Sequence, residues 1–518
     1  MPGVAAQDIV RAWPWRIFDS LTKDLSTPAR RMLAGIFLLT LVRFILGAWL
    51  PLSFDEAYYW LWSRHLALSY FDHPPAIAYA IRAGTVLFGD TSFGVRVVPL
   101  LGSLFASFAV WDAARILLRS RSAAALACLY LNLTLMVAAE TMAATPDALA
   151  LAASALVLWS LVRLQDSKDG RWWIAVGATG GLCLLSKYTG FFLGAGVFFW
   201  LIAVADGRRW LTSPWPYFAV VLALGLFAPV IFWNATHDWM SFKFQFGRVA
   251  SGGWTPRYML EFVLAQLTLA SPFLLLLAGA GFVRASRFGG TGSPLALLAY
   301  LVWPSLAYFA VHALHDRVQG NWPSYLYPIL AILAALASGA DWRGGSVRAL
   351  VRISRLLAVP TAAMLLAAVY AQAFFGVLHV RDPISRLTAI EFKPVAEEIA
   401  RMAQAQKARA IVTTSYAATA WLAFYSKSSI PVVQINETYR WLAAPQADPA
   451  LSHAPLLYVA LAPKTASEDS RMPEIVHRFS QFRYLASIDR KRHRVRIETY
   501  DIYNVSGWEG GALGRVPR

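Results

Sequence analysis

Two neighbouring carboxylates are the first residues in the chain whose types and spacing suit chemistry. Asp55 and Glu56 follow a long apolar segment, and Tyr58, Tyr59 and Trp60 come directly after them. Paired carboxylates at a membrane surface raise each other's pKa, and a carboxyl group tuned in this way can act as a general base. Acidic residues also simply solvate the first turn of a helix, where they complement its dipole. The dipeptide alone leaves both interpretations open.

A rigid turn follows in the same segment. Asp72 and His73 precede Pro74 and Pro75, and the two prolines fix the backbone and remove two amide donors. Histidine changes its charge near neutral pH and can ligate a metal. Most single histidines are structural, but one that stands between an acid and a rigid turn favours a functional site.

Two ionisable residues lie further along, next to apolar runs. Asp147 follows Thr145 and Pro146, which suit the N-cap and the first position of a helix, so Asp147 could belong to an ordinary helix start. Lys187 interrupts an apolar run, where a lysine costs roughly 2.5–3.5 kcal/mol unless it is paired or reaches water. We expect Lys187 to bind an anion such as a lipid phosphate; snorkelling to the interface is the alternative.

Polar side chains also gather in two later segments. His237 and Asp238 stand in an aromatic segment, and Arg317 and Asn321 stand in HDRVQGNW. Cations here suggest an anionic ligand, although each residue alone is more often a solvated surface group. The acids and histidines would permit a divalent metal, but the chemistry developed below requires neither a metal nor another cofactor.

The composition shows what kind of scaffold positions these residues. Of 518 residues, 57% are hydrophobic and 15% are charged, whereas soluble domains contain about 25% charged residues. The net charge of +17 would suit nucleic acid, but many of the basic residues stand in short loops between apolar runs, so membrane topology explains them better. Cys128 and Cys183 both lie in apolar segments, which argues against a disulfide framework.

A spanning helix needs about twenty apolar residues, and this criterion predicts about eleven spans. They lie near 31–52, 95–118, 122–140, 146–164, 172–186, 188–205, 215–233, 259–283, 295–314, 323–340 and 349–375. Lys187 makes the pair at 172–205 the weakest of these assignments.

Charge segregates between the two sets of loops. Alternate loops hold Arg30, Arg31, Arg119, Arg121, Arg163, Lys168, Arg171, Arg208, Arg209, Arg284, Arg287, Arg343, Arg348, Arg352 and Arg355. By the positive-inside rule these loops face the cytoplasm. The opposite loops hold the acid, histidine and lysine motifs described above. The sequence therefore predicts that those motifs converge on the outer side of a cell membrane.

The chain changes character after about residue 376. Short strands are expected at 409–416, 431–435, 455–461 and 493–503, and an amphipathic helix at 391–406. We therefore expect a cytoplasmic segment at 1–30, a transmembrane module at 31–375 and a small α/β domain at 376–518. An odd number of spans would place the last domain outside the cytoplasm, in the periplasm.

The motifs resemble those of a known family. FDEAYYWLWSRHLALSYFDHPP (54–75), TPDAL, LSKYTGFF (185–192), FWNATHDWMSF (232–242) and GNWPSYLYP (320–328) resemble the GT-C glycosyltransferases. Within these enzymes the chain is similar to the superfamily of protein O-mannosyltransferases and aminoarabinose (lipid A) transferases. Aminoarabinose transferases typically carry Glu-Lys before the two prolines, where this chain has Asp72-His73. The C-terminal domain is more in keeping with the bacterial lipid-glycosylating branch.

The resemblance implies a sugar donor carried on polyprenyl phosphate and a catalytic Asp55 supported by Glu56. We expect transfer, with inversion, to lipid A, a lipopolysaccharide core or a related glycolipid, by a monomer that binds no nucleic acid. His73, Lys187 and Arg317 would hold the donor phosphate. Positioning of the sugar or the acceptor would fall to Asp72, Asp147, His237, Asp238 and Asn321. The alternatives are a flippase or transporter of lipid-linked sugars, a protein O-mannosyltransferase, or a non-catalytic scaffold; the sugar itself remains open.

Overall fold

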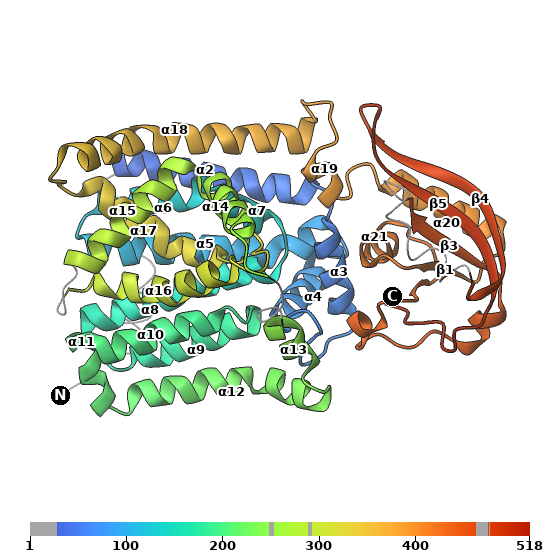
Figure 1. Ribbon diagram of the computed structural model, residues 1–518, viewed down its shortest axis with the longest axis horizontal. Helices are drawn as coiled ribbons and strands as arrows, with labels where there is room; N and C mark the ends of the chain where they lie inside the picture. Colours follow the sequence, from blue (N-terminus) through green and yellow to red (C-terminus); the bar gives the residue numbers. More distant parts are fainter. Residues whose placement is uncertain (1–27, 248–252, 289–292, 463–474, 476, 518) are drawn as a thin grey trace, which may run out of the picture.

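The chain forms a long bundle of helices with a sheet-containing domain at one end (Figure 1). This computed structural model describes residues 28–247, 253–288, 293–462, 475 and 477–517. The predicted cytoplasmic segment at 1–30 lies almost entirely outside the described residues. The helical part ends with α18 (Gly345–Phe375), and all of the strands follow it.

Among the described residues, five helices are long and apolar enough to cross a membrane. They are α2 (Pro28–Trp49), α5 (Ser92–Leu118), α8 (Pro146–Ser167), α12 (Trp215–Thr236) and α18. The shorter apolar helices are α4 (Ala76–Phe88), α9 (Trp172–Ser186), α16 (Ala296–His312) and α17 (Tyr327–Gly339), which follows the turn η3 (Ser324–Leu326). This arrangement confirms a polytopic, α-helical membrane protein.

Three further predicted spans are each broken into two helices. The first pair is α6 (Arg121–Leu133) with α7 (Leu135–Met142), bent by 66°. The second is α10 (Gly190–Ala203) with α11 (Ala205–Arg208) and η1 (Arg209–Thr212), bent by 97°. The third is α14 (Arg257–Ala270) with α15 (Pro272–Phe288), bent by 103°. All eleven predicted segments contain helix, but at most eight spans are found when each bent pair counts as one, so the number eleven is not confirmed.

Local chemistry explains the sharpest bend. Ser271 has a φ of +75°, a conformation that does not continue a right-handed helix, and Pro272 starts the next helix without needing an amide donor. The predicted span at 259–283 therefore consists of two helices joined at a sharp bend, which the sequence reading did not foresee.

The long helices differ in how deeply they lie in the bundle. In the most apolar part of α8, 78% of the residues are buried, compared with 22% in α2 and 28% in both α12 and α18. Large apolar side chains such as Phe37, Phe232 and Leu356 are exposed on the outer helices, as expected for surfaces that face lipid. Figure 1 shows α18 and α12 along opposite outer edges of the bundle.

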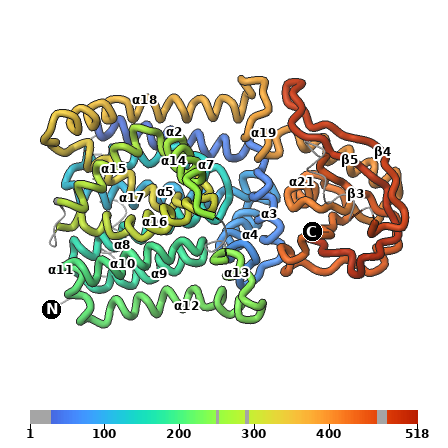
Figure 2. Tube along the Cα trace, viewed as in Figure 1, coloured from blue at the N-terminus to red at the C-terminus, as the bar shows by residue number. Residues whose placement is uncertain are grey.

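The segment between α2 and α5 is not an extended loop. It forms α3 (Phe54–Arg64) and α4, which lie between the bundle and the C-terminal domain (Figure 2). Trp60 of α3, Phe392 and Trp421 belong to one hydrophobic cluster. The two parts of the molecule therefore share a core.

The described residues of the C-terminal domain form one five-stranded sheet in the order β2-β1-β3-β5-β4. The strands are β1 (Ala410–Thr413), β2 (Val432–Gln434), β3 (Leu456–Leu461), β4 (Phe479–Arg492) and β5 (Val495–Trp508). The helices are α19 (Pro383–Leu387), α20 (Lys393–Ala405) and α21 (Tyr416–Tyr425). β1 pairs in parallel with β2 and β3, and β5 pairs antiparallel with β3 and β4. The expected small α/β domain is confirmed, with four of its strands predicted and β4 not.

The β4–β5 hairpin ties this domain to the bundle. Arg492 donates hydrogen bonds to the carbonyl oxygen of Ala373 in α18, at 2.9 Å, and to the Ser385 hydroxyl, at 3.1 Å. Arg490 donates to the carbonyl oxygen of Thr388 at 2.9 Å and pairs with Glu498. Both arginines are buried, so the hairpin holds the domain against the end of α18.

Candidate active site

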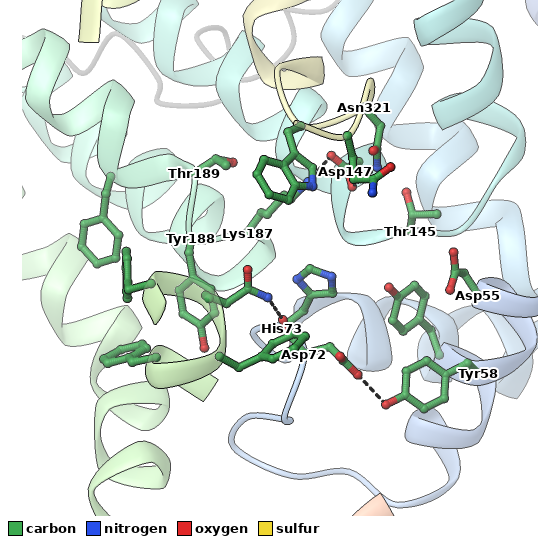
Figure 3. A pocket seen from close by; sticks show the side chains of 18 of the residues that line it. Asp55, Tyr58, Asp72, His73, Thr145, Asp147, Lys187, Tyr188, Thr189 and Asn321 are labelled. Atoms are coloured by element: carbon green, nitrogen blue, oxygen red, sulfur yellow. Dashed lines mark hydrogen bonds and ion pairs between the residues drawn. The ribbon is translucent and has the colours of Figure 1, made fainter. Parts of the chain in front are cut away.

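A cavity of about 750 Å³ lies where the helix ends meet α3 and the C-terminal domain. It is lined by six residues that the sequence motifs predicted, which are Asp55, Asp72, His73, Asp147, Lys187 and Asn321. These residues come from four segments far apart in sequence, and Figure 3 shows their side chains around one space. The roles predicted for them remain predictions, but the convergence on which those roles depend is present.

Asp55 is placed by the start of α3. The Ser53 hydroxyl accepts from the Glu56 amide at 3.2 Å, and the Glu56 carboxylate accepts from the Ser53 amide at 2.8 Å. This reciprocal capping box starts the helix and sets Asp55 in its first turn. Asp55 therefore meets the cavity from a rigid element.

The surroundings of Asp55 disfavour its charged form. Its side chain is partly accessible from the cavity but is surrounded by protein. Burial, followed by the negative charge of Asp72, raises the pKa of Asp55 from 3.8 to about 7. A hydrogen bond from the Tyr416 hydroxyl, at 3.5 Å, and the charge of Arg440 oppose this rise. At neutral pH the group can therefore both accept and release a proton.

Glu56 lies behind Asp55 rather than in the cavity lining. Arg96 of α5 donates to both of its carboxylate oxygens, at 2.6 Å each, and to the carbonyl oxygens of Gly47 and Leu50. Glu56 also accepts from the Ala144 amide at 3.0 Å. Both charged side chains are almost fully buried. Glu56 therefore fixes α3 against three neighbouring segments, which suits the supporting role predicted for it.

Asp72 joins the turn before α4 to the C-terminal domain. One carboxylate oxygen accepts from the Tyr58 hydroxyl at 2.6 Å, and the other accepts from the Arg440 guanidinium at 2.6 Å. Arg440 lies in η4 (Thr438–Trp441) and also pairs with Glu437 at 3.2 Å. Its guanidinium packs over the Tyr416 ring. The C-terminal domain therefore supplies a cation, Arg440, and an aromatic side chain, Tyr416, to the cavity lining.

His73 follows Asp72 and lines the same cavity. Its ring packs edge-on against the Tyr59 ring, with 6.2 Å between the centroids. The carbonyl oxygen of His73 accepts from the Tyr70 amide at 3.3 Å, which closes the turn. In the view of Figure 3, His73 stands between Lys187 and Asp72.

Asp147 and Lys187 form a buried pair. Thr145 caps α8 and Asp147 lies in its first turn, as the sequence predicted, while Lys187 lies in extended backbone between α9 and α10. The Lys187 ammonium donates to Asp147 at 2.5 Å, and Asn321 and Ser324 donate to the same carboxylate at 3.0 Å each. Both charges are buried, so Lys187 is a partnered cation in the cavity wall and not one that snorkels away.

Besides Glu56, three residues predicted for the site do not line the cavity. Arg317 is exposed and pairs with Glu261 at 2.9 Å. His237 stacks on Trp233 with centroids 4.1 Å apart, and Asp238 is exposed. The structure does not bring these three to the other candidates. Neighbours outside the cavity hold Arg317 and His237, and Asp238 is exposed.

Sequence reasoning did not find Arg440 and Tyr416. Both lie in the C-terminal domain, and Arg440 is 368 residues from its partner Asp72. Nothing in the local pattern of the two segments distinguishes them from ordinary surface positions. Arg96 was also missed, although an arginine near the start of an apolar span was a usable signal.

The cavity lining contains many aromatic side chains beside its charged ones. From the helices and the segments between them come Phe191, Phe192, Phe242, Phe244, Phe246, Tyr308 and Phe309. The same cavity is lined by the three acids, His73, Lys187 and Arg440. Within the described ranges there is no group of three or more histidine, cysteine, aspartate or glutamate residues arranged to hold a metal ion. The cavity therefore combines charged and aromatic side chains in one lining.

Comparisons with known proteins agree with these features. Residues 72–233 match the family described as dolichyl-phosphate-mannose-protein mannosyltransferase. The chain is 25% identical over 294 residues to the lipid A galacturonosyltransferase RgtD of Rhizobium johnstonii, covering 56% of this chain and 61% of that protein. It is 27% identical over 333 residues to undecaprenyl phosphate-alpha-4-amino-4-deoxy-L-arabinose arabinosyl transferase 1 of Pseudomonas fluorescens, covering 56% and 55% respectively. The chain thus spans less than two thirds of the length of either relative.

Solved structures share the fold. ArnT from Cupriavidus metallidurans, bound to undecaprenyl phosphate, superposes with a TM-score of 0.62 at 14% identity, over 93% of this chain and 98% of that one. The archaeal oligosaccharyltransferase AglB from Archaeoglobus fulgidus gives a TM-score of 0.51 at 12% identity, over 84% of this chain and 70% of that one. Together the comparisons confirm the resemblance drawn from the motifs and the architecture of helices followed by a small sheet domain.

Proposed function

We propose that this chain, a multi-pass membrane protein with the fold and motifs of the GT-C glycosyltransferases, transfers a sugar from a polyprenyl-phosphate donor. The acceptor is lipid A, a lipopolysaccharide core or a related envelope glycolipid. The protein would reside in the inner membrane, with its cavity and C-terminal domain on the periplasmic side. The names of RgtD and of the aminoarabinose transferase support this substrate class.

The observation that carries the proposal is the cavity itself. Asp55, His73, Asp147 and Lys187 line one space although they stand in three separate segments of the chain. The charged side chains of the lining suit a phosphate and a sugar, and its aromatic side chains suit a prenyl chain. A lipid-linked sugar phosphate needs both surfaces in one site.

In the proposed reaction, Asp55 takes the proton from an acceptor hydroxyl as its oxygen attacks the anomeric carbon. The bond between that carbon and the phosphate oxygen breaks, and the phosphate leaves with the electron pair. Attack from the side opposite the phosphate inverts the anomeric centre. The group with a pKa near 7 is suited to accept this proton at neutral pH.

Charge on the leaving phosphate must be stabilised by cations in a poorly hydrated cavity. His73 and Lys187 are the candidates that line it. Lys187 already shares its charge with Asp147, so it acts as part of a pair, and Arg440 adds a third cation nearby. Arg317 would take part only from the surface, where it pairs with Glu261. The scheme requires no metal or other cofactor.

The test is transfer from a radiolabelled polyprenyl-linked sugar in membranes that contain the full chain. Asp55→Asn should reduce transfer by about 10²–10⁴-fold, because general base catalysis contributes about that much. The matched control is Asp238→Asn, which removes an exposed carboxylate outside the cavity and should leave the rate unchanged. A folded Asp55→Asn protein with near-normal transfer would refute the base assignment. A wild-type protein that moves lipid-linked sugar across the bilayer without transferring it would be a flippase instead.

A further inference from the structure

A second hollow lies at the end of the bundle away from the candidate active site. It is a groove of about 900 Å³ between the C-terminal end of α17, the turn that follows it and the start of α18. In Figure 1 this corner is at the opposite end of α18 from the C-terminal domain. Its residues play no part in the chemistry described above.

Three arginines of α18 line this groove, namely Arg348, Arg352 and Arg355. Their spacing places them on one face of the helix, one turn after another. In the described part of the chain none of the three has a carboxylate partner. Asp341 is the one acidic residue in the lining, so the groove keeps an excess of positive charge.

Other contacts shape the groove. The Trp342 side chain donates to the carbonyl oxygen of Ala337 at 3.0 Å, and the guanidinium of Arg284 packs over its ring at 5.7 Å. At the other side, the Ser338 hydroxyl is hydrogen-bonded to Tyr130 at 3.0 Å. The groove is therefore bounded by a fixed aromatic side chain and by a buried hydroxyl pair, and the arginines stand along its edge.

The surroundings point to a lipid as the occupant. The arginines stand in the first turns of α18, and further along this helix Leu356 and Met364 are exposed and present apolar side chains outward. A headgroup phosphate in the groove would meet the guanidinium groups, and its acyl chains would continue along this apolar face. A free phosphate ion would use only the first of these two features.

We propose that the groove formed by Ser338, Trp342, Arg348, Arg352 and Arg355 binds the phosphate of an anionic phospholipid from the adjacent leaflet. Positive loops by themselves explain the topology of the chain. They do not require a hollow of this size next to three arginines without acidic partners. Such basic pockets between helices are suited to anionic headgroups.

The test is native mass spectrometry of the purified full chain with phosphatidylglycerol or phosphatidylcholine. The wild type should retain phosphatidylglycerol preferentially. Replacing all three arginines, as Arg348→Gln, Arg352→Gln and Arg355→Gln together, should weaken this binding by at least about tenfold, because each basic side chain contributes several-fold. The three Arg→Lys replacements should keep most of it.

Two controls separate this site from general surface charge and from misfolding. Arg119→Gln, Arg208→Gln and Arg209→Gln together remove equal charge from other predicted cytoplasmic loops and should leave the binding unchanged. Ala349→Phe fills the groove, whose lining includes Ala349, while keeping every charge, and should abolish the preference. Equal loss in both triple variants, or retention in Ala349→Phe, would overturn the proposal. If inorganic phosphate displaced the lipid and bound as tightly as the lipid does, the groove would be a phosphate site and the lipid proposal would be wrong.

Discussion

The protonation state of Asp55 controls what its carboxyl group can do at neutral pH. A general base works only when ionised, and burial beside Asp72 raises the pKa of Asp55 to about 7. Transfer should therefore rise with pH through about 7 and then level off. Initial rates measured with labelled donor from about pH 5 to pH 9 would show this profile.

The same profile contains its own control. Asp72→Asn removes a negative charge that raises the pKa of Asp55 and leaves Arg440 without that partner. Both changes favour the ionised carboxylate, so the midpoint should move to lower pH. Asp238→Asn should not move it. A midpoint that stays in place in Asp72→Asn would mean that another group limits the reaction.

Variants of the Lys187–Asp147 pair can distinguish its contribution to stability from its contribution to donor binding. Lys187→Met leaves Asp147 buried without its cation and should lower the free energy of unfolding by about 3–5 kcal/mol. The double variant Lys187→Met with Asp147→Asn removes both charges and should recover most of that stability, but not donor binding. Thermal unfolding and the KM for the donor would test both statements. Full recovery of transfer in the double variant would exclude Lys187 from phosphate binding.

At the scale of elements, α3 is the part on which the site most depends. The Glu56–Arg96 pair is bidentate and buried, and it connects α3 with α5 and with the end of α2. Glu56→Gln should destabilise the protein by about 3–5 kcal/mol, because it leaves a buried guanidinium unpaired. Transfer should fall as well, because Asp55 loses its rigid support.

Ser53→Ala is the matched comparison for this element. It removes the hydroxyl of the capping box but keeps the ion pair, so the loss of stability should be only about 1 kcal/mol. Chemical unfolding of both variants would measure the difference. Equal losses would mean that the cap, and not the arginine pair, holds α3.

Apolar runs and helix starts were the predictable elements. A backbone in lipid must satisfy its own hydrogen bonds, so every long apolar run is helical here, and Thr145-Pro146 begins α8 as expected. The bends escaped prediction because they depend on single residues, such as Ser271 with its positive φ. β4 escaped because its sequence, FSQFRYLASIDRKR, carries charges on a strand that is exposed for much of its length.

At the scale of the whole molecule, the C-terminal domain is joined to the site through Arg440 and Asp72. Arg440→Gln should weaken donor use and increase hydrogen exchange in the turn before α4. In a double-mutant cycle with Asp72→Asn, the two changes should not be additive, because they break the same contact. Additive effects on transfer would show that Arg440 acts independently of Asp72.

The contact between Arg440 and Asp72 also shows which part of the site could be predicted from the sequence. The sequence predicted five of the ionisable residues that line the cavity, namely Asp55, Asp72, His73, Asp147 and Lys187. An ionisable residue beside an apolar run is costly to place in a membrane, so it indicates a functional site. The contribution of Arg440 was not predictable, because an arginine in a soluble domain is common and only the tertiary fold brings it to Asp72. Arg317 lies outside the cavity, paired with Glu261. The sequence pattern could not show this, because it predicts the side of the membrane but not the direction of a side chain.

Because the helical bundle and the C-terminal domain both line the cavity, the order of synthesis has a consequence for the site. A ribosome completes all of the membrane helices before it makes Tyr416 and Arg440, which lie in the last part of the chain, and N-terminal parts generally fold first. The nascent protein therefore passes through membrane insertion with an open, unfinished pocket. Under the proposed function, a lipid-linked sugar would meet a complete site only after the C-terminal domain has docked on the bundle, so a chain halted before that point would be inactive.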